Sequence, residues 1–72
     1  MAAHEVPIVD DAIRLGQFLK LASLIDSGAD AKSVIADGMV SVNGEVEVRR
    51  GRQLRPGDTV TFGDTSARVT RG

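Results

Sequence analysis

The chain has no cysteine, tryptophan or tyrosine, and a single histidine, in 72 residues. Without thiols it can form neither a disulfide framework nor a thiolate metal site, and it is compatible with a reducing compartment. His4 alone cannot form a zinc site. No apolar run approaches the ~20 residues of a membrane span, and the acidic first residues do not resemble a secretory signal. These absences predict a soluble cytoplasmic protein without a cofactor or metal.

The residue patterns of common enzyme sites are missing as well. The sequence has no cysteine, no usable histidine and no phosphate loop of the GxxxxGK[ST] type. Most aspartates lie where helices are expected to begin or end, and capping explains a carboxylate at such a position. We therefore expect a protein that is not an enzyme and has no catalytic residues.

Charge is unevenly distributed, although the formal net charge is only −1. Residues 1–38 carry three basic and six acidic side chains, whereas residues 39–72 carry six arginines and four acids. Four of these arginines lie within Arg49–Arg55, a segment without an acid. A local basic patch suits an anionic partner, and a solvated arginine-rich loop explains it equally well.

The first stretch with helical periodicity has apolar residues at i, i+3, i+4 and i+7. The residues of this stripe are Leu15, Phe18, Leu19 and Ala22. They predict an amphipathic helix of about three turns, with Asp10 and Asp11 at its N-terminus. Gly16, inside this helix, indicates close approach of another backbone or is merely tolerated.

A second helix is predicted by apolar residues at i, i+3 and i+4, namely Ala31, Val34 and Ile35. Ser27, Gly28 and Asp30 are its start signals. Gly38 is expected to end it, because glycine adopts the left-handed conformation of a C-terminal cap at little steric cost.

After Gly38 the hydrophobic period changes to two, which predicts strands on both sides of an Asn43-Gly44 turn. A two-residue turn would pair Val42 with Glu45 and mix valines with glutamates on one face. A longer or bulged turn would pair Val42 with Val46 and keep the valines together. Following the valines, we expect Val42 and Val46 to be buried on the same face, with Glu45 and Glu47 exposed.

Further alternation predicts short strands at Gln53–Leu54, at Val60 to Phe62 and at Ala67 to Val69, separated by turns at residues 56–58 and 63–64. The predicted fold class is α+β, with two N-terminal helices packed on a small antiparallel β-sheet of four to five short strands. Residues 1–9 have no clear period and are expected to be a tail or lead-in. Residues 10–72 are expected to form a single domain.

Several motifs, in this order and at this spacing, resemble those of the S-four RNA-binding domain, also called the αL motif. They are Arg14-Leu15, Ser27, Ala31-Lys32, GMVSVNG at residues 38–44 and PGD at residues 56–58. More narrowly, LGQFLK at 15–20, the Gly28 to Lys32 step and EVRRGRQLRPGD at 47–58 are similar to small stand-alone bacterial YaaA/YbcJ-like proteins. The resemblance extends over residues 12–62.

This resemblance implies a module that binds structured RNA, with ribosomal or transfer RNA as the expected class, as a monomer that associates with ribosomes. The surface would be formed by the second helix and the loop after the hairpin. The candidate residues carried over are Arg14, Ser27, Lys32, Ser33, Asn43, Arg49, Arg50, Arg52 and Arg55. The usual Ser-Arg at the start of the second helix is Ser27-Gly28 here, so one expected phosphate contact is missing.

Physical chemistry is consistent with this expectation. Arginine forks and helix N-termini suit the phosphates and shape of structured RNA. The lack of Tyr and Trp disfavours base stacking on single strands.

Two other functions fit parts of the sequence. A protein-interaction module could use the same arginines to bind an acidic partner, and the sequence does not separate it from RNA binding. A ubiquitin-like sulfur carrier would share the VNG hairpin and a late Gly-Asp turn, but such carriers act through a C-terminal Gly-Gly. Here the sequence ends Thr70-Arg71-Gly72, and two helices precede the sheet.

Overall fold

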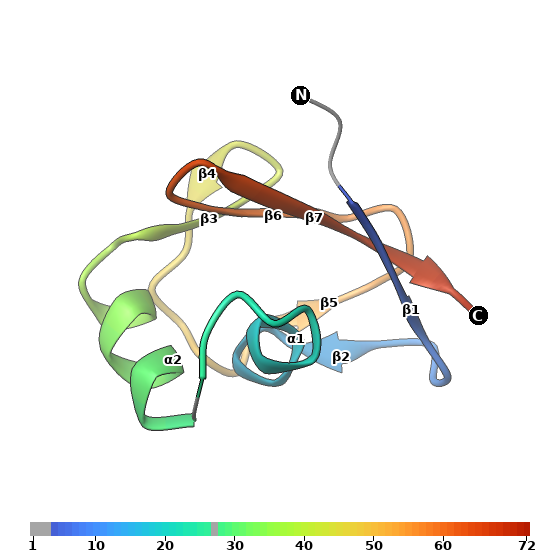
Figure 1. Ribbon diagram of the computed structural model, residues 1–72, viewed down its shortest axis with the longest axis horizontal. Coiled ribbons are helices and arrows are strands. Elements are labelled where there is room, and N and C mark those ends of the chain that lie inside the picture. Colours follow the sequence, from blue (N-terminus) through green and yellow to red (C-terminus); the bar gives the residue numbers. More distant parts are fainter. Residues whose placement is uncertain (1–3, 27) are drawn as a thin grey trace.

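The structure, a computed structural model, describes residues 4–26 and 28–72. In Figure 1 both helices lie on the same side of the main sheet. The elements in chain order are β1 (His4–Ile8), β2 (Ile13–Arg14), α1 (Leu15–Leu21), α2 (Gly28–Ala36), β3 (Val40–Val42), β4 (Glu45–Val46), β5 (Gln53–Leu54), β6 (Thr59–Phe62) and β7 (Thr65–Arg71).

Five strands form a mixed sheet in the order β1-β7-β6-β3-β4, and β2 pairs with β5 in a separate two-stranded sheet. The α+β class is confirmed, but the main sheet is not wholly antiparallel, because β1 runs parallel to β7. The expected lead-in is therefore a strand from His4 onward. Its buried Val6 and Ile8 alternate with exposed neighbours, and Pro7 is tolerated because β1 is an edge strand.

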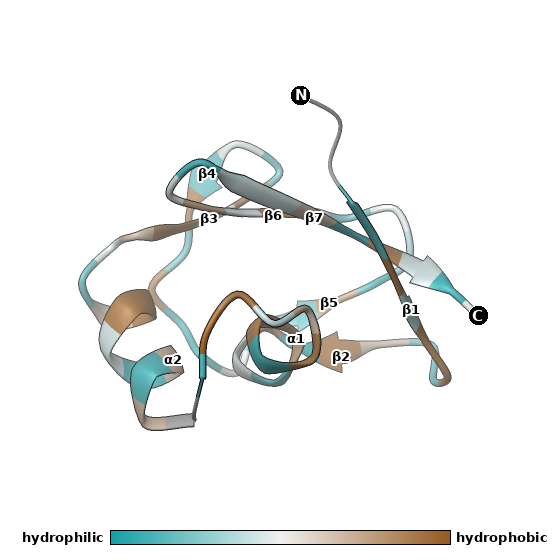
Figure 2. Cartoon of the chain, viewed as in Figure 1, coloured by the Kyte–Doolittle hydropathy of each residue, from teal (hydrophilic) through white to brown (hydrophobic). Residues whose placement is uncertain are grey.

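Side chains from both helices and from both sheets form one buried hydrophobic cluster. Its members are Val6, Ile8, Leu15, Phe18, Leu19, Ala22, Ala31, Ile35, Val40, Val42, Leu54, Val60, Ala67 and Val69. The apolar stripe of the first helix and the Ala31 and Ile35 positions of the second are thus confirmed as core. Figure 2 shows the last turn of α2 as hydrophobic and the segment between β4 and β5 as largely hydrophilic.

The first helix is shorter than the sequence predicts. It begins at Leu15, with Arg14 at the N-cap, and not at Asp10 or Asp11. The residues before it are extended because Ile13 and Arg14 pair with β5. Asp11 instead forms an ion pair with Arg71.

The second helix ends as predicted. Gly38 has a φ of +76°, and its N–H donates to the Ile35 carbonyl at 3.1 Å. The Met39 N–H donates to the Val34 carbonyl at 3.0 Å. These two bonds are those of a Schellman cap, which places a left-handed glycine just after the helix.

The register predicted for the β3–β4 hairpin is wrong. Asn43 and Gly44 both have positive φ, of 53° and 86°, as in a two-residue type I′ turn. This turn pairs Val42 with Glu45. Val46 is consequently 62% exposed, whereas Glu47 is only 6% exposed.

Turn geometry therefore outweighs the valine pattern at this hairpin. The buried position of Glu47 is tolerated because two arginine side chains pair with its carboxylate.

Candidate nucleic-acid interface

Residues 49–52, called the basic loop here, leave the sheet after β4 and are anchored on α1. The Leu15 N–H donates to the Arg52 carbonyl at 2.8 Å, and the Gly16 N–H donates to the Arg50 carbonyl at 3.1 Å. Two of the N–H groups that a helix leaves unpaired at its N-terminus are thus satisfied by the loop backbone. The first turn of α1 serves as the attachment point of the basic loop.

Glu47 is the ionic centre of this region. Its Oε2 accepts hydrogen bonds from the Arg49 backbone N–H at 3.1 Å and from Arg49 Nε at 3.2 Å. Its Oε1 accepts from Arg49 Nη2 at 3.2 Å and from Arg52 Nη1 at 3.0 Å. The side chain of Arg49, then that of Arg52, and the Arg49 N–H lower the pKa of Glu47 to about 2, against the opposing effect of burial. The same pair raises the pKa of Arg49.

Gly16 allows Arg50 to lie across α1. A Cβ atom at Gly16 would be 2.8 Å from Arg50 Cγ and 3.7 Å from the Arg50 carbonyl oxygen. The first distance is shorter than real Cβ contacts allow. Of the two explanations that the sequence left open for Gly16, the structure therefore supports close approach, by the side chain and backbone of Arg50.

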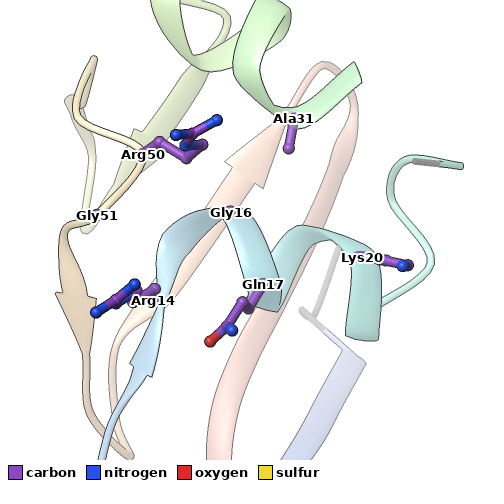
Figure 3. Close-up of a pocket in the computed structure, with 7 residues that line it drawn as sticks. All are labelled: Arg14, Gly16, Gln17, Lys20, Ala31, Arg50 and Gly51. Atoms are coloured by element: carbon purple, nitrogen blue, oxygen red, sulfur yellow. The ribbon is translucent and has the colours of Figure 1, made fainter. Parts of the chain in front are cut away.

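An open pocket of about 530 Å³ lies where the basic loop meets the two helices. It is lined by Arg14, Gly16, Gln17, Lys20, Ala31, Arg50 and Gly51. Figure 3 shows the Arg50 side chain extending from the basic loop toward Ala31, with Arg14 and Gln17 projecting from the α1 side. Three of the lining side chains are cationic, and none is acidic. Such a pocket is suited to an anionic group.

The structure brings together only some of the candidate residues. One group lies at the basic loop and the start of α1, and it consists of Arg14, Arg49, Arg50 and Arg52. A second group surrounds Asp58, whose Oδ1 accepts from Asn43 Nδ2 at 3.1 Å and whose Oδ2 accepts from the Arg55 N–H at 2.8 Å. Asn43 Oδ1 also accepts the Thr59 N–H at 3.0 Å. Both ends of the Asn43 amide are thus engaged within the protein.

Of the α2 candidates, neither Lys32 nor Ser33 lines the pocket with Arg50. Lys32 and Ser33 are exposed, and Ser33 lines a separate pocket together with Asp26 and Asp30. Two acids beside Ser33 make this side of α2 less suited to phosphate than the basic loop. Ser27 lies outside the described residues.

Sequence reasoning missed Gln17 and Lys20, which line the pocket with Arg50. A signal for both was present. Together with Arg14 they recur at i, i+3 and i+6, off the apolar stripe of α1, and this spacing places them on one side of a helix.

Two features are absent from residues 4–26 and 28–72. No group of three or more His, Cys, Asp or Glu side chains there could hold a metal ion. No helix in that part of the chain is long and apolar enough to cross a membrane.

The chain is similar to curated bacterial proteins over most of its length. It is 48% identical over 58 residues to a probable ribosome maturation protein, RlbA, of Bacillus subtilis, covering 81% of this chain and 82% of that protein. It is 42% identical over 57 residues to the putative RNA-binding protein YbcJ of Escherichia coli, covering 79% and 81%.

Solved structures agree with these relationships. The solution structure of E. coli YbcJ, described as having an αL motif involved in RNA binding, matches with a TM-score of 0.68 and 37% identity. That match covers 97% of this chain and 87% of YbcJ. Ribosomal protein S4e of Thermoplasma acidophilum matches with a TM-score of 0.63 and 22% identity, over 82% of this chain and 31% of S4e, and shows the fold alone. The S4 domain family model matches residues 6–70, and the chain belongs to this family.

Proposed function

We propose that this protein binds structured RNA through the pocket-facing side of α1 and the basic loop, and that it does so without catalysing a reaction. The observation that carries the proposal is that Arg14, Lys20 and Arg50 all line one pocket, whose lining contains no acid. The RNA-binding descriptions of YbcJ support it. On this geometry the basic loop acts with α1, and α2 contributes the small side chain of Ala31 at the edge of the pocket.

The chemistry of the surface favours phosphate and shape recognition over base stacking. Guanidinium and ammonium groups bind backbone phosphates irrespective of sequence. Phe18 is fully buried and Phe62 is half-buried in the core, so neither offers a platform for single-stranded bases. Folded RNA presents closely spaced phosphates in a fixed arrangement, which a pocket with three cations can match. We propose ribosomal or transfer RNA as the class, bound by a monomer, in line with the ribosome maturation description of RlbA.

The direct test measures binding of the purified protein to ribosomal RNA fragments and to transfer RNA over a range of salt concentrations. If the three cations contact about three phosphates, the slope of log K against log salt should be roughly −2 to −3. Arg50→Ala should reduce both the affinity and the slope. Arg68→Ala is the matched control, because Arg68 is an exposed arginine on β7 that does not line the pocket. Absence of RNA binding at low salt, or equal losses from the two variants, would contradict the proposal.

A further inference from the structure

Glu47 is an unusual residue to find in a basic surface. Among the described residues it is the only charged or polar side chain that is buried. It lies next to the edge strand β4, and its N–H donates to the Val40 carbonyl at 3.0 Å, which continues the hairpin ladder. The backbone of Glu47 is therefore held to the sheet by a hydrogen bond.

The contacts of Glu47 determine how the basic loop leaves that sheet. The Arg49 N–H and two of its side-chain nitrogens, Nε and Nη2, donate to the carboxylate, and Arg52 Nη1 binds it from the other end of the loop. One carboxylate thus holds both ends of a four-residue loop. Arg50, between them, has no bond to Glu47 and lies over Gly16 instead.

We propose that Glu47 is a positioning residue for RNA binding, which holds the basic loop in the shape that lays Arg50 across α1 and into the pocket. This inference rests on the RNA-binding function proposed above. Under this proposal the arginines of the basic loop have different roles. Arg49 and Arg52 fix the conformation of the loop by pairing with Glu47, and Arg50 contacts the RNA phosphate.

Whether Glu47→Gln strengthens or weakens RNA binding distinguishes a positioning role of Glu47 from a simple effect of its charge. Glu47 places a negative charge within a basic surface, so its neutralisation raises the local positive charge. If charge alone governed binding, Glu47→Gln would bind RNA more tightly. If Glu47 positions Arg50, the same variant binds more weakly, because the loop loses its charged anchor and Arg50 leaves the pocket.

The experiment compares Glu47→Gln with Glu45→Gln, an exposed glutamate two residues earlier on the same hairpin. Glu47→Gln should weaken binding to a ribosomal RNA fragment by about fivefold or more, and Glu45→Gln should not weaken it. Amide hydrogen exchange provides a readout without RNA. Exchange at Leu15 and Gly16, whose N–H groups donate to the loop carbonyls, should become faster in Glu47→Gln. Exchange at Asn43, whose N–H donates to Thr59, should not change.

A double-mutant cycle tests positioning itself, since Glu47 acts on RNA only through Arg50 in this scheme. Arg50→Ala should cost about tenfold in the parent and about threefold or less in the Glu47→Gln background. Additive losses would overturn the proposal, as would tighter or unchanged binding by Glu47→Gln. If Glu47→Gln unfolds, Glu47→Met replaces the charge with an apolar side chain of similar volume and takes its place with the same expectations.

Failure of the RNA-binding function would look different. In that case the parent protein itself would not bind RNA, whatever residue 47 is. If the parent binds and Arg50→Ala weakens it, the function stands, and only the results at Glu47 decide the inference.

Discussion

Two carboxylates organise the two corners of the molecule where candidate RNA contacts lie, and they do so by different means. Glu47 is buried and accepts four hydrogen bonds, three of them from guanidinium groups. Asp58 accepts from a backbone N–H and from the neutral amide of Asn43 in a more exposed setting. At Glu47 the guanidinium donors and the carboxylate acceptor both carry charge, whereas the donors to Asp58 are neutral, and charge on the partners strengthens a hydrogen bond.

Because their hydrogen-bond donors differ, the two corners have different structural roles. The Asp58 corner ties a Pro-Gly turn to the β3–β4 hairpin and can be formed without any charged donor side chain. At the Glu47 corner, Arg49 and Arg52 pair with the carboxylate and hold the loop that carries Arg50. We infer that the first corner serves mainly the fold and the second serves the binding surface.

The largest effect should come from reversing the charge of Arg50, with the reversal of Arg55 at the other corner as the comparison. Arg50→Glu is expected to weaken RNA binding by roughly tenfold or more, a loss of about 1.4 kcal/mol, because it introduces an acid into the pocket. Arg55→Glu, at the Asp58 corner, should weaken it by about threefold or less. Fluorescence anisotropy with one labelled RNA measures both. Equal losses would remove the functional distinction between the corners.

A smaller effect is expected from filling the space under Arg50. Gly16→Ala places a Cβ 2.8 Å from Arg50 Cγ, so the arginine must move, and RNA binding should weaken by about fivefold. The thermal midpoint should change little, because the higher helix propensity of alanine, worth up to ~1 kcal/mol, opposes the cost of displacing Arg50.

Gly51→Ala is the matched control for this change, since nothing lies within 4 Å of a Cβ at Gly51. It should leave RNA binding nearly unchanged. Equal binding by Gly16→Ala and the parent would show that the position of Arg50 over α1 does not matter.

At the Asp58 corner the expected effect is on stability. Asn43→Gly keeps a residue that accepts positive φ but removes the bonds to Asp58 and Thr59. Urea unfolding should show a loss of about 1 kcal/mol. RNA affinity of the folded variant should remain that of the parent, and a tenfold loss would instead identify Asn43 as an RNA contact.

The smallest effect concerns pH and distinguishes Glu47 from exposed acids. Its pKa is lowered from 4.5 to about 2 in the folded protein. The unfolded chain therefore binds more protons between these values, so the contribution of Glu47 to stability is complete above about pH 4.5 and is lost as pH falls toward 2. Thermal midpoints across this range should converge for the parent and Glu47→Gln. If the thermal midpoints of the two proteins instead differ by the same amount at all pH values, the contacts with Arg49 and Arg52 do not lower the pKa of Glu47.

The sequence was sufficient where one local rule acted alone. The stripe of α1, the left-handed Gly38 and the Pro-Gly turn each depend on neighbours in the chain, and each is present in the structure. The hairpin register failed because two local rules disagreed there, the turn chemistry of Asn43-Gly44 and the alternation of valines. The burial of Glu47 is tolerated because Arg49 and Arg52 pair with its carboxylate, and no periodicity in the sequence reveals these contacts.

The candidate site was predictable in its residue types and less so in its arrangement. The arginines of the basic loop were identified, but the sequence did not show that Glu47 binds two of them. It also did not show that the loop docks on α1, because that contact consists of backbone hydrogen bonds to Leu15 and Gly16. Backbone contacts of this kind leave no side-chain signature in the sequence.

The parallel pairing of β1 with β7 has a consequence for the order of folding. His4 pairs with Ala67 and Ile8 with Arg71, so nearly the whole chain forms the connection between the two partners. Closing so long a loop is entropically costly and slows a folding step that depends on it. During synthesis β1 cannot pair until β7 has left the ribosome, so the β1 edge of the main sheet cannot be completed before then.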